Sequence, residues 1–132
     1  MTLKKLIESK KLDWVNPNIT ENSFPIQPED KEKNRVYKLF HFNRSISSDD
    51  AIKEMEKGGF RPGILPELLA LGETQPELQR QFPIVALGSI WQRSDGNRFV
   101  PILGRGVAGR GLGLDWFEGD WDGCYRFLAV RK

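Results

Sequence analysis

The residues best suited to chemistry are four carboxylates near the C-terminal end of the chain. Asp115, Glu118, Asp120 and Asp122 follow one another closely among glycines and aromatic residues. A hard cation such as calcium binds several carboxylate oxygens on a tight turn, so a metal site is one interpretation. The same residues also suit a turn whose carboxylates face solvent or a ligand, and their spacing alone does not choose between the two.

Covalent catalysis would need a nucleophile beside a base. His41 is the only histidine and Cys124 the only cysteine, and they lie far apart in the sequence with no nucleophile motif around either. We therefore interpret His41 as a hydrogen-bonded strand residue and Cys124 as a small surface or interface side chain. A single cysteine also forms no internal disulfide. The sequence predicts no enzyme and no catalytic residue.

A glycine-rich segment, Gly104-Arg-Gly-Val-Ala-Gly109, matches the Gly-x-Gly-x-x-Gly pattern of dinucleotide-binding loops. No helical pattern follows it and no strand-helix-strand unit surrounds it, so a hairpin loop is the better interpretation. Arg105 and Arg110 in this segment also permit an RNA-binding module, but the acidic turn that follows would repel phosphate.

Composition gives one domain and names no partner. The chain has 132 residues, 39% hydrophobic and 29% charged, with 20 Lys plus Arg against 18 Asp plus Glu. This even charge creates no strong positive field, which argues against nucleic acid. No apolar stretch approaches a membrane span, and the lysine-rich start is unlike a signal peptide. We expect a cytoplasmic protein by default, with virion or surface association open.

The elements that must position these residues begin with a proline-containing N-terminal region. Residues 2–12 predict a short amphipathic helix or an arm. Asp13–Lys33 contains Pro17, Pro25 and Pro28 and predicts a surface loop, with Trp14, Ile19 and Phe24 as its contacts to the body. We assign 1–35 to this arm and loop, and 36–132 to the domain proper.

Two to three short helices are expected after a strand at Val36–Phe42. Ser47 or Ser48 should cap a helix that Gly58-Gly59 ends. A second helix should run from Pro66 to Leu71 and end at Gly72. A third should lie between Pro76 and Pro83, capped by Thr74.

From Ile84 onward the pattern is that of short strands separated by turn residues. Asp95-Gly96 is the best hairpin signal, and Tyr125–Lys132 predicts a strand covered on both faces. Helices first and strands afterwards indicate an α+β fold with a small, mainly antiparallel sheet. The other expected strands are 84–87, 89–91, 98–103 and 112–117.

Within residues 36–132 this order resembles the C-type lectin-like fold of formylglycine-generating-enzyme relatives and of variable proteins from diversity-generating retroelements. Gly59-Phe-Arg-Pro62, Glu67-Leu-Leu69 and the closing strand 125–132 carry the resemblance. One departure is that Gly63-Ile-Leu-Pro66 offers no side-chain cap for the Leu-rich helix. The formylglycine-generating activity needs a cysteine pair, and the calcium motifs of lectins are absent. The resemblance therefore implies neither metal nor cofactor.

The retroelement resemblance rests on the last forty residues. Mutating adenines of Asn-type codons yields mainly polar and small residues, whereas Trp codons lack adenine and stay constant. Residues 104–125 have this composition. The resemblance implies that their tryptophans are constant anchors between replaceable side chains. The resemblance implies a display protein whose loops at about 92–125 bind varied proteins or surface glycans. Its alternatives are a non-variable accessory domain of the same fold, a small enzyme of unknown reaction, and an RNA-binding module.

The expected site divides into two sets. We expect the anchors to be buried, so that Trp116→Ala would destabilise the fold by about 3 kcal/mol. The predicted anchors are Trp91, Trp116, Phe117, Trp121 and Phe127. The predicted ligand-binding residues are Arg93, Arg105, Val107, Ala108, Arg110, Asp115, Asp120, Asp122, Gly123, Cys124 and Tyr125.

Overall fold

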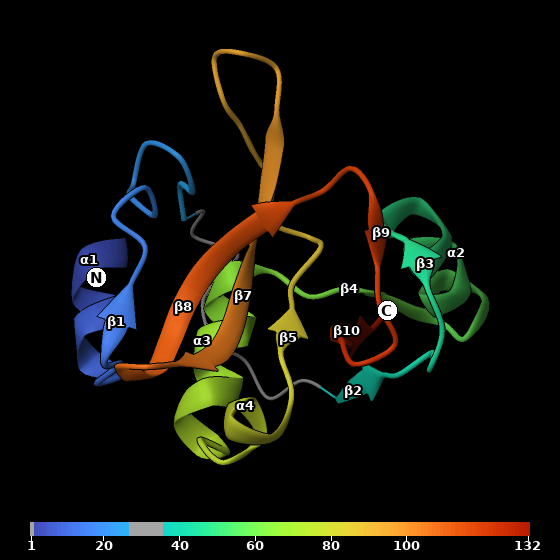
Figure 1. The fold of residues 1–132 in the computed structure, drawn as a ribbon, viewed down its shortest axis with the longest axis horizontal. Coiled ribbons are helices and arrows are strands. Elements are labelled where there is room, and N and C mark those ends of the chain that lie inside the picture. Colours follow the sequence, from blue (N-terminus) through green and yellow to red (C-terminus); the bar gives the residue numbers. More distant parts are fainter. Residues whose placement is uncertain (1, 27–35) are drawn as a thin grey trace.

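A computed structural model describes residues 2–26 and 36–132, and in this part of the chain it shows an α+β fold (Figure 1). Four short helices accompany an eight-stranded sheet in the order β1-β8-β7-β5-β10-β2, with β4 added to β10 and β6 added to β7. Strands β3 and β9 form a separate pair. The bounds are α1 Leu3–Ser9, β1 Trp14–Val15, β2 Tyr37–Phe40, β3 Ile46–Ser47, α2 Ser48–Lys57, β4 Phe60–Pro62, α3 Leu65–Thr74, α4 Leu78–Gln81, β5 Ile84–Val85, β6 Trp91–Gln92, β7 Arg98–Gly106, β8 Gly109–Trp116, β9 Asp120–Trp121 and β10 Arg126–Arg131.

The N-terminal residues belong to the same core as the rest. Helix α1 buries Leu3 and Ile7, so residues 2–12 contain a packed helix, one of the two structures predicted there. Three further helices follow β2, within the two to three expected, so the described helices number four. In the predicted loop, Ile19 and Phe24 are buried as expected, whereas Trp14 is 49% exposed. The predicted loop residues 27–33 lie outside the described part.

Helix α2 forms where capping chemistry predicted it. The Ser47 hydroxyl accepts a hydrogen bond from the backbone N–H of Asp50 at 3.1 Å, and Asp49 adds negative charge to the same turn. The helix ends at Gly58, as predicted, and buries Ala51 and Met55 against the sheet.

Helix α3 differs from its prediction at both ends. It continues through Gly72 to Thr74, because Gly72 is needed for close packing and not for a turn: a Cβ there would lie 2.9 Å from the Leu103 side chain. Thr74 caps nothing and donates back to the Ala70 carbonyl. At the other end, the Ser89 hydroxyl accepts from the backbone N–H of Leu65 at 2.7 Å. A residue distant in sequence thus supplies the missing cap.

Strand β10 is central, as its apolar pattern predicted. It pairs antiparallel with β2 and β4 and parallel with β5, and its residues from Phe127 to Val130 are all buried. The β1–β8 pairing is also parallel, so the sheet is mixed although most pairs are antiparallel. The predicted Asp95-Gly96 hairpin is confirmed, since Trp91 pairs with Phe99 across it.

The sheet separates two apolar cores. One is centred on Leu68, Leu103 and Leu112, where α1, α3 and α4 cover one face. The other contains Met55 and Trp121 and is covered by α2 and the β3–β9 pair. Burial on both faces is what holds a sheet of such short strands in one register.

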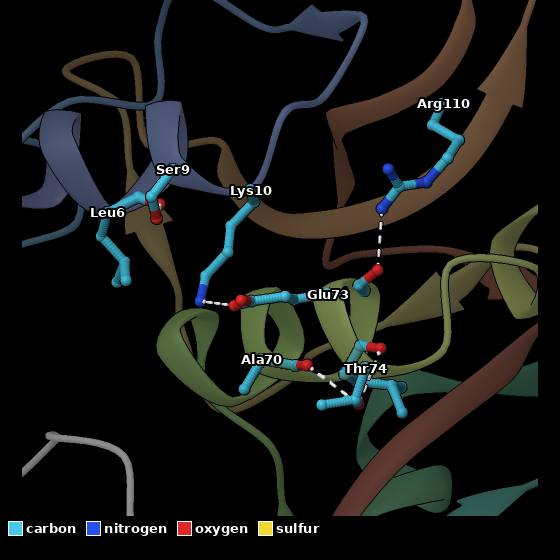
Figure 2. Close-up of polar contacts among 9 residues, drawn as sticks. Leu6, Ser9, Lys10, Ala70, Glu73, Thr74 and Arg110 are labelled. Carbon is cyan, nitrogen blue, oxygen red and sulfur yellow. Dashed lines mark hydrogen bonds and ion pairs between the residues drawn. The ribbon is translucent and has the colours of Figure 1, made fainter.

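The β8 strand is tied to the end of α3 by Arg110 (Figure 2). Its guanidinium donates to the Gly72 carbonyl at 2.8 Å and to the Gln79 side-chain oxygen at 3.2 Å. A second cation at this end, Lys10, pairs with Glu73. These bonds satisfy a carbonyl in the last helical turn, which otherwise lacks a partner within the helix. Arg110 therefore belongs to the scaffold, not to the ligand-binding set.

Replacing Arg110 with Ala should lower the free energy of unfolding by about 1–3 kcal/mol, because it leaves partly buried acceptors unsatisfied. Its cross-strand neighbour Arg105 is exposed and offers a matched control. Arg105→Ala should change the same quantity by less than about 0.5 kcal/mol. Urea unfolding of both variants measures the difference, and equal effects would contradict the assignment of Arg110.

Candidate ligand-binding face

The β7–β8 hairpin places the predicted ligand-binding residues at opposite ends. Phe99 lies opposite Trp116 at one end, and Gly106 lies opposite Gly109 at the other. At the rise of an extended strand, Gly109 and Trp116 are roughly 23 Å apart. Arg105, Val107 and Ala108 lie at the hairpin turn, far from the carboxylates, so the structure does not unite the predicted set on one face.

The larger group gathers where β8 ends and the chain passes through β9 into β10 (Figure 1). We call Asp115, Trp116, Asp120, Asp122 and Tyr125 the acidic end. Tyr125 is half-buried, and the other four side chains are exposed. In this region exposed residues flank the buried Phe117 and Trp121 on both sides. The chain therefore presents polar groups outward from a buried aromatic frame.

Three of the five predicted anchors are confirmed as buried. Phe117, Trp121 and Phe127 are 5%, 3% and 1% exposed. The Trp121 indole N–H donates to the Ser48 hydroxyl at 2.8 Å, and that hydroxyl donates to the Phe117 carbonyl at 2.7 Å. Ser48 is itself buried, so these two bonds fix β9 and the end of β8 onto the start of α2.

Trp116 as a buried anchor is wrong, because its side chain is 61% exposed. Strand β1 flanks β8 only at Gly111 and Leu112, so the end of β8 extends beyond any covering element. Trp91 is intermediate: it is partly buried and packs against the first core. Its ring is tilted by 35° from that of Phe99, with 5.6 Å between the ring centroids. Trp116 is better placed to contact a ligand than to support the fold.

The hydroxyl of Tyr125 donates a hydrogen bond to the carboxylate of Asp115. Its ring meets Trp121 edge-on, with 4.9 Å between the ring centroids. Burial, followed by the charges of Asp115 and Asp122, raises the pKa of its hydroxyl. The phenol, which is protonated at neutral pH already at its ordinary pKa, therefore stays protonated to a higher pH.

Cys124 is exposed but not activated. A hydrogen bond from the thiol to the Asp122 carboxylate raises the thiol pKa and lowers the pKa of Asp122. The same carboxylate accepts the Cys124 backbone N–H at 2.9 Å. A raised pKa means less thiolate, which is the nucleophilic form.

His41 lies closer to this turn than the sequence suggested. Its ring Nε2 is 2.7 Å from the Gly123 carbonyl, and Gly123 packs against the backbone of Asn43 and Arg44. His41 is hydrogen-bonded, as predicted, although it follows β2 and is not part of it. Gly123 is thus fixed by contacts that leave little room for a side chain.

The arginines beside the acidic end are already paired. Arg93 bonds Asp95 at 2.6 Å and Arg98 bonds Glu118 at 2.5 Å. The Arg93 hydrogen bond lowers the pKa of Asp95 to about 2. Sequence reasoning did not assign Glu118 a partner, because Arg98 is its neighbour only across strands β7 and β8. In the described part of the chain, no three metal-ligating side chains converge.

Comparison with family models, curated proteins and solved structures found no match for the chain. No helix within residues 2–26 or 36–132 is both long and apolar enough to cross a bilayer. The case for function therefore rests on the geometry of the acidic end.

Trp121→Ala should destabilise the protein by about 3–5 kcal/mol, since it empties a buried site and leaves Ser48 without its donor. Trp116→Ala, at a neighbouring exposed tryptophan, should change stability by less than about 1 kcal/mol. Chemical denaturation followed by circular dichroism compares the two. A larger loss for Trp116→Ala would overturn the division into frame and exposed face.

Asp122→Asn should accelerate alkylation of Cys124 by iodoacetamide at mildly alkaline pH. Removing the negative charge lowers the raised thiol pKa toward its ordinary value, so more thiolate is present at a given pH. Asp120→Asn removes a charge that has no part in the Cys124 shift and serves as the control. Mass spectrometry over time gives the rates, and equal rates in both variants would refute the Asp122–Cys124 interaction.

Proposed function

We propose that this protein is a non-enzymatic ligand-binding display protein. In this proposal its fold is of the C-type lectin-like type, and the acidic end binds another macromolecule, a protein or a surface glycan. The two buried aromatics Phe117 and Trp121, set among mostly exposed residues from Asp115 to Tyr125, support the proposal most directly. A surface that tolerates many sequences needs variable side chains that do no packing, held by constant residues that do.

The chemistry of the acidic end agrees with this role. Trp116 and Tyr125 offer large, rigid contact area at a small cost in side-chain entropy, which favours aromatic residues in binding surfaces. The turn that carries Asp122 is held by the His41–Gly123 bond and by the Cys124 backbone bond. Preorganisation of this kind reduces the entropy lost on binding.

Diversification by a retroelement is the mechanism that we propose for this surface. It predicts that a reverse-transcriptase gene and a near-copy template of the 3′ coding end lie beside the gene. Sequencing the flanking DNA checks this expectation. Relatives with an invariant acidic end and no such template would instead favour a fixed, non-variable binding domain.

Randomising the acidic end should leave the fold intact and produce new binders. A phage-displayed library varied at Asp115, Trp116, Asp120 and Asp122 should retain folded, protease-resistant members and yield clones selective for unrelated protein targets. A matched library varied at Ser48, Phe117, Trp121 and Phe127 should lose most folded members, because those positions are buried. Similar losses in both libraries, or no selectable binder from the first, would reject the display function.

A further inference from the structure

We propose that a groove beside strand β6 binds an extended, uncharged peptide segment of another protein, which adds a strand to the outer edge of β6. The groove shares no residue with the acidic end, so this inference goes beyond the proposed function and does not depend on it. Two independent features support it: a groove with apolar walls, and outward backbone groups at β6 that no described residue pairs.

The groove lies where three segments distant in the sequence meet. Its volume is about 320 Å³, and it is bounded by residues 23–26, the start of α3 and residues 88–90. The walls include the side chains of Ile26, Ile64 and Ile90, and none of the described residues that line the groove is charged. The volume is at the lower end of the range for ligand pockets. Such a groove favours apolar side chains over charged ones, which would lose hydration without gaining a partner.

Two glycines hold the walls of the groove in contact. A Cβ on Gly88 would lie 2.6 Å from the carbonyl oxygen of Gly63, and a Cβ on Gly63 would lie 2.6 Å from the Leu128 side chain. The backbone N–H of Gly88 donates to the Gly63 carbonyl at 2.8 Å. The hydrogen bond from Leu65 to Ser89 joins the same two segments. The groove is therefore preformed, which lowers the entropy lost by ordering on binding.

The outer edge of β6 has backbone groups that are available for pairing. Among the described strands β6 pairs with β7 alone, and the N–H of Arg93 donates to the Asn97 carbonyl at 2.8 Å, so it faces β7. The backbone groups of an antiparallel strand point alternately toward its neighbour and away from it. The carbonyl of Ile90 and both backbone groups of Gln92 therefore point away from β7. None of these three groups forms a backbone hydrogen bond with a described residue.

An extended peptide satisfies both features at once. Its backbone pairs with Gln92 as an added strand does, while alternate side chains enter the groove beside Ile90. The residues of β6, Trp91 and Gln92, carry no charge that would protect this edge from pairing. A small apolar molecule would leave the edge groups of β6 unpaired, and a nucleic acid would find no cation in the described groove lining for its phosphates. The observations therefore favour a peptide.

The test selects phage-displayed random octapeptides against the whole protein and titrates the selected sequences as capped synthetic peptides. Binding is followed by NMR, with the backbone amide signals of the protein assigned. The selected peptides should carry apolar residues at alternate positions, because every second side chain of an added strand faces the groove. They should shift the amide signals of Ile90 and Gln92.

Two variants remove one feature each, and each has a matched control. Gln92→Pro deletes the outward N–H but no bond to β7, because a sheet edge tolerates proline where its N–H would face solvent. Gln92→Thr keeps that N–H. Ile90→Asp puts a charge at the groove, whereas Val107→Asp makes the same kind of change at an exposed residue of the β7–β8 turn. Circular dichroism and urea unfolding verify that all four variants are folded.

Gln92→Pro and Ile90→Asp should each weaken binding of the selected peptides about tenfold, the loss expected from one hydrogen bond or one apolar contact, and the controls by less than about twofold. A second comparison changes only the peptide and needs no protein variant. N-methylating each peptide amide in turn should weaken binding about tenfold at every second position, where the amide faces β6, and less than about threefold in between.

Three outcomes would overturn the inference: no selected peptide, unmoved signals of Ile90 and Gln92, or equal losses in the variants and their controls. Uniform losses along the N-methylated peptide would reject the added strand in the same way. The library of the acidic end varies other residues, so the display function and the peptide groove can fail separately.

Discussion

The buried indole of Trp121 is the contact on which the exposed acidic end depends. Its N–H reaches Ser48 at the start of α2, and Ser48 in turn reaches the carbonyl of Phe117. Two hydrogen bonds thus join the start of α2 to the end of β8 and to β9, about seventy residues further along the chain. An unmade bond in such a buried site costs more than in water. Because β9 has only two residues, its own ladder would not hold it in place.

This attachment separates the part of the chain that packs from the part that is free. Trp121 meets Phe127 of the central strand and Tyr125 of the preceding turn edge-on, so the frame continues into the second core. On the other side of the chain, Asp120 and Asp122 point away from that core. A buried residue with exposed neighbours on either side gives a rigid frame and a polar outer surface at once.

The two ends of the β7–β8 hairpin consequently have different roles. At the turn, Arg110 leaves the hairpin to bond α3 and α4, and glycine at position 72 lets Leu103 approach the helix. At the strand end, β8 extends past its short neighbour β1, and Trp116 stays in solvent. The sequence predicted Arg110 in the ligand-binding set and Trp116 as a buried anchor, and the structure shows the reverse. Whether a strand residue is buried here depends on which segment covers it, and not on the hydrophobicity of the residue.

By itself the sequence determined what acts over a few residues: the Ser47 cap and glycine end of α2, the Asp95-Gly96 hairpin, the covered strand β10, and the buried positions Phe117, Trp121 and Phe127. Capping, turn and alternation patterns are local, so a single sequence reveals them. Only the tertiary structure decided that Ser89 caps α3, that Gly72 lies inside that helix, that His41 bonds Gly123, and that Trp116 and Arg110 exchange roles. All but the exposure of Trp116 depend on a contact between segments distant in the chain, and Trp116 is exposed because no distant segment covers it. Such contacts are set by packing geometry that no local pattern encodes.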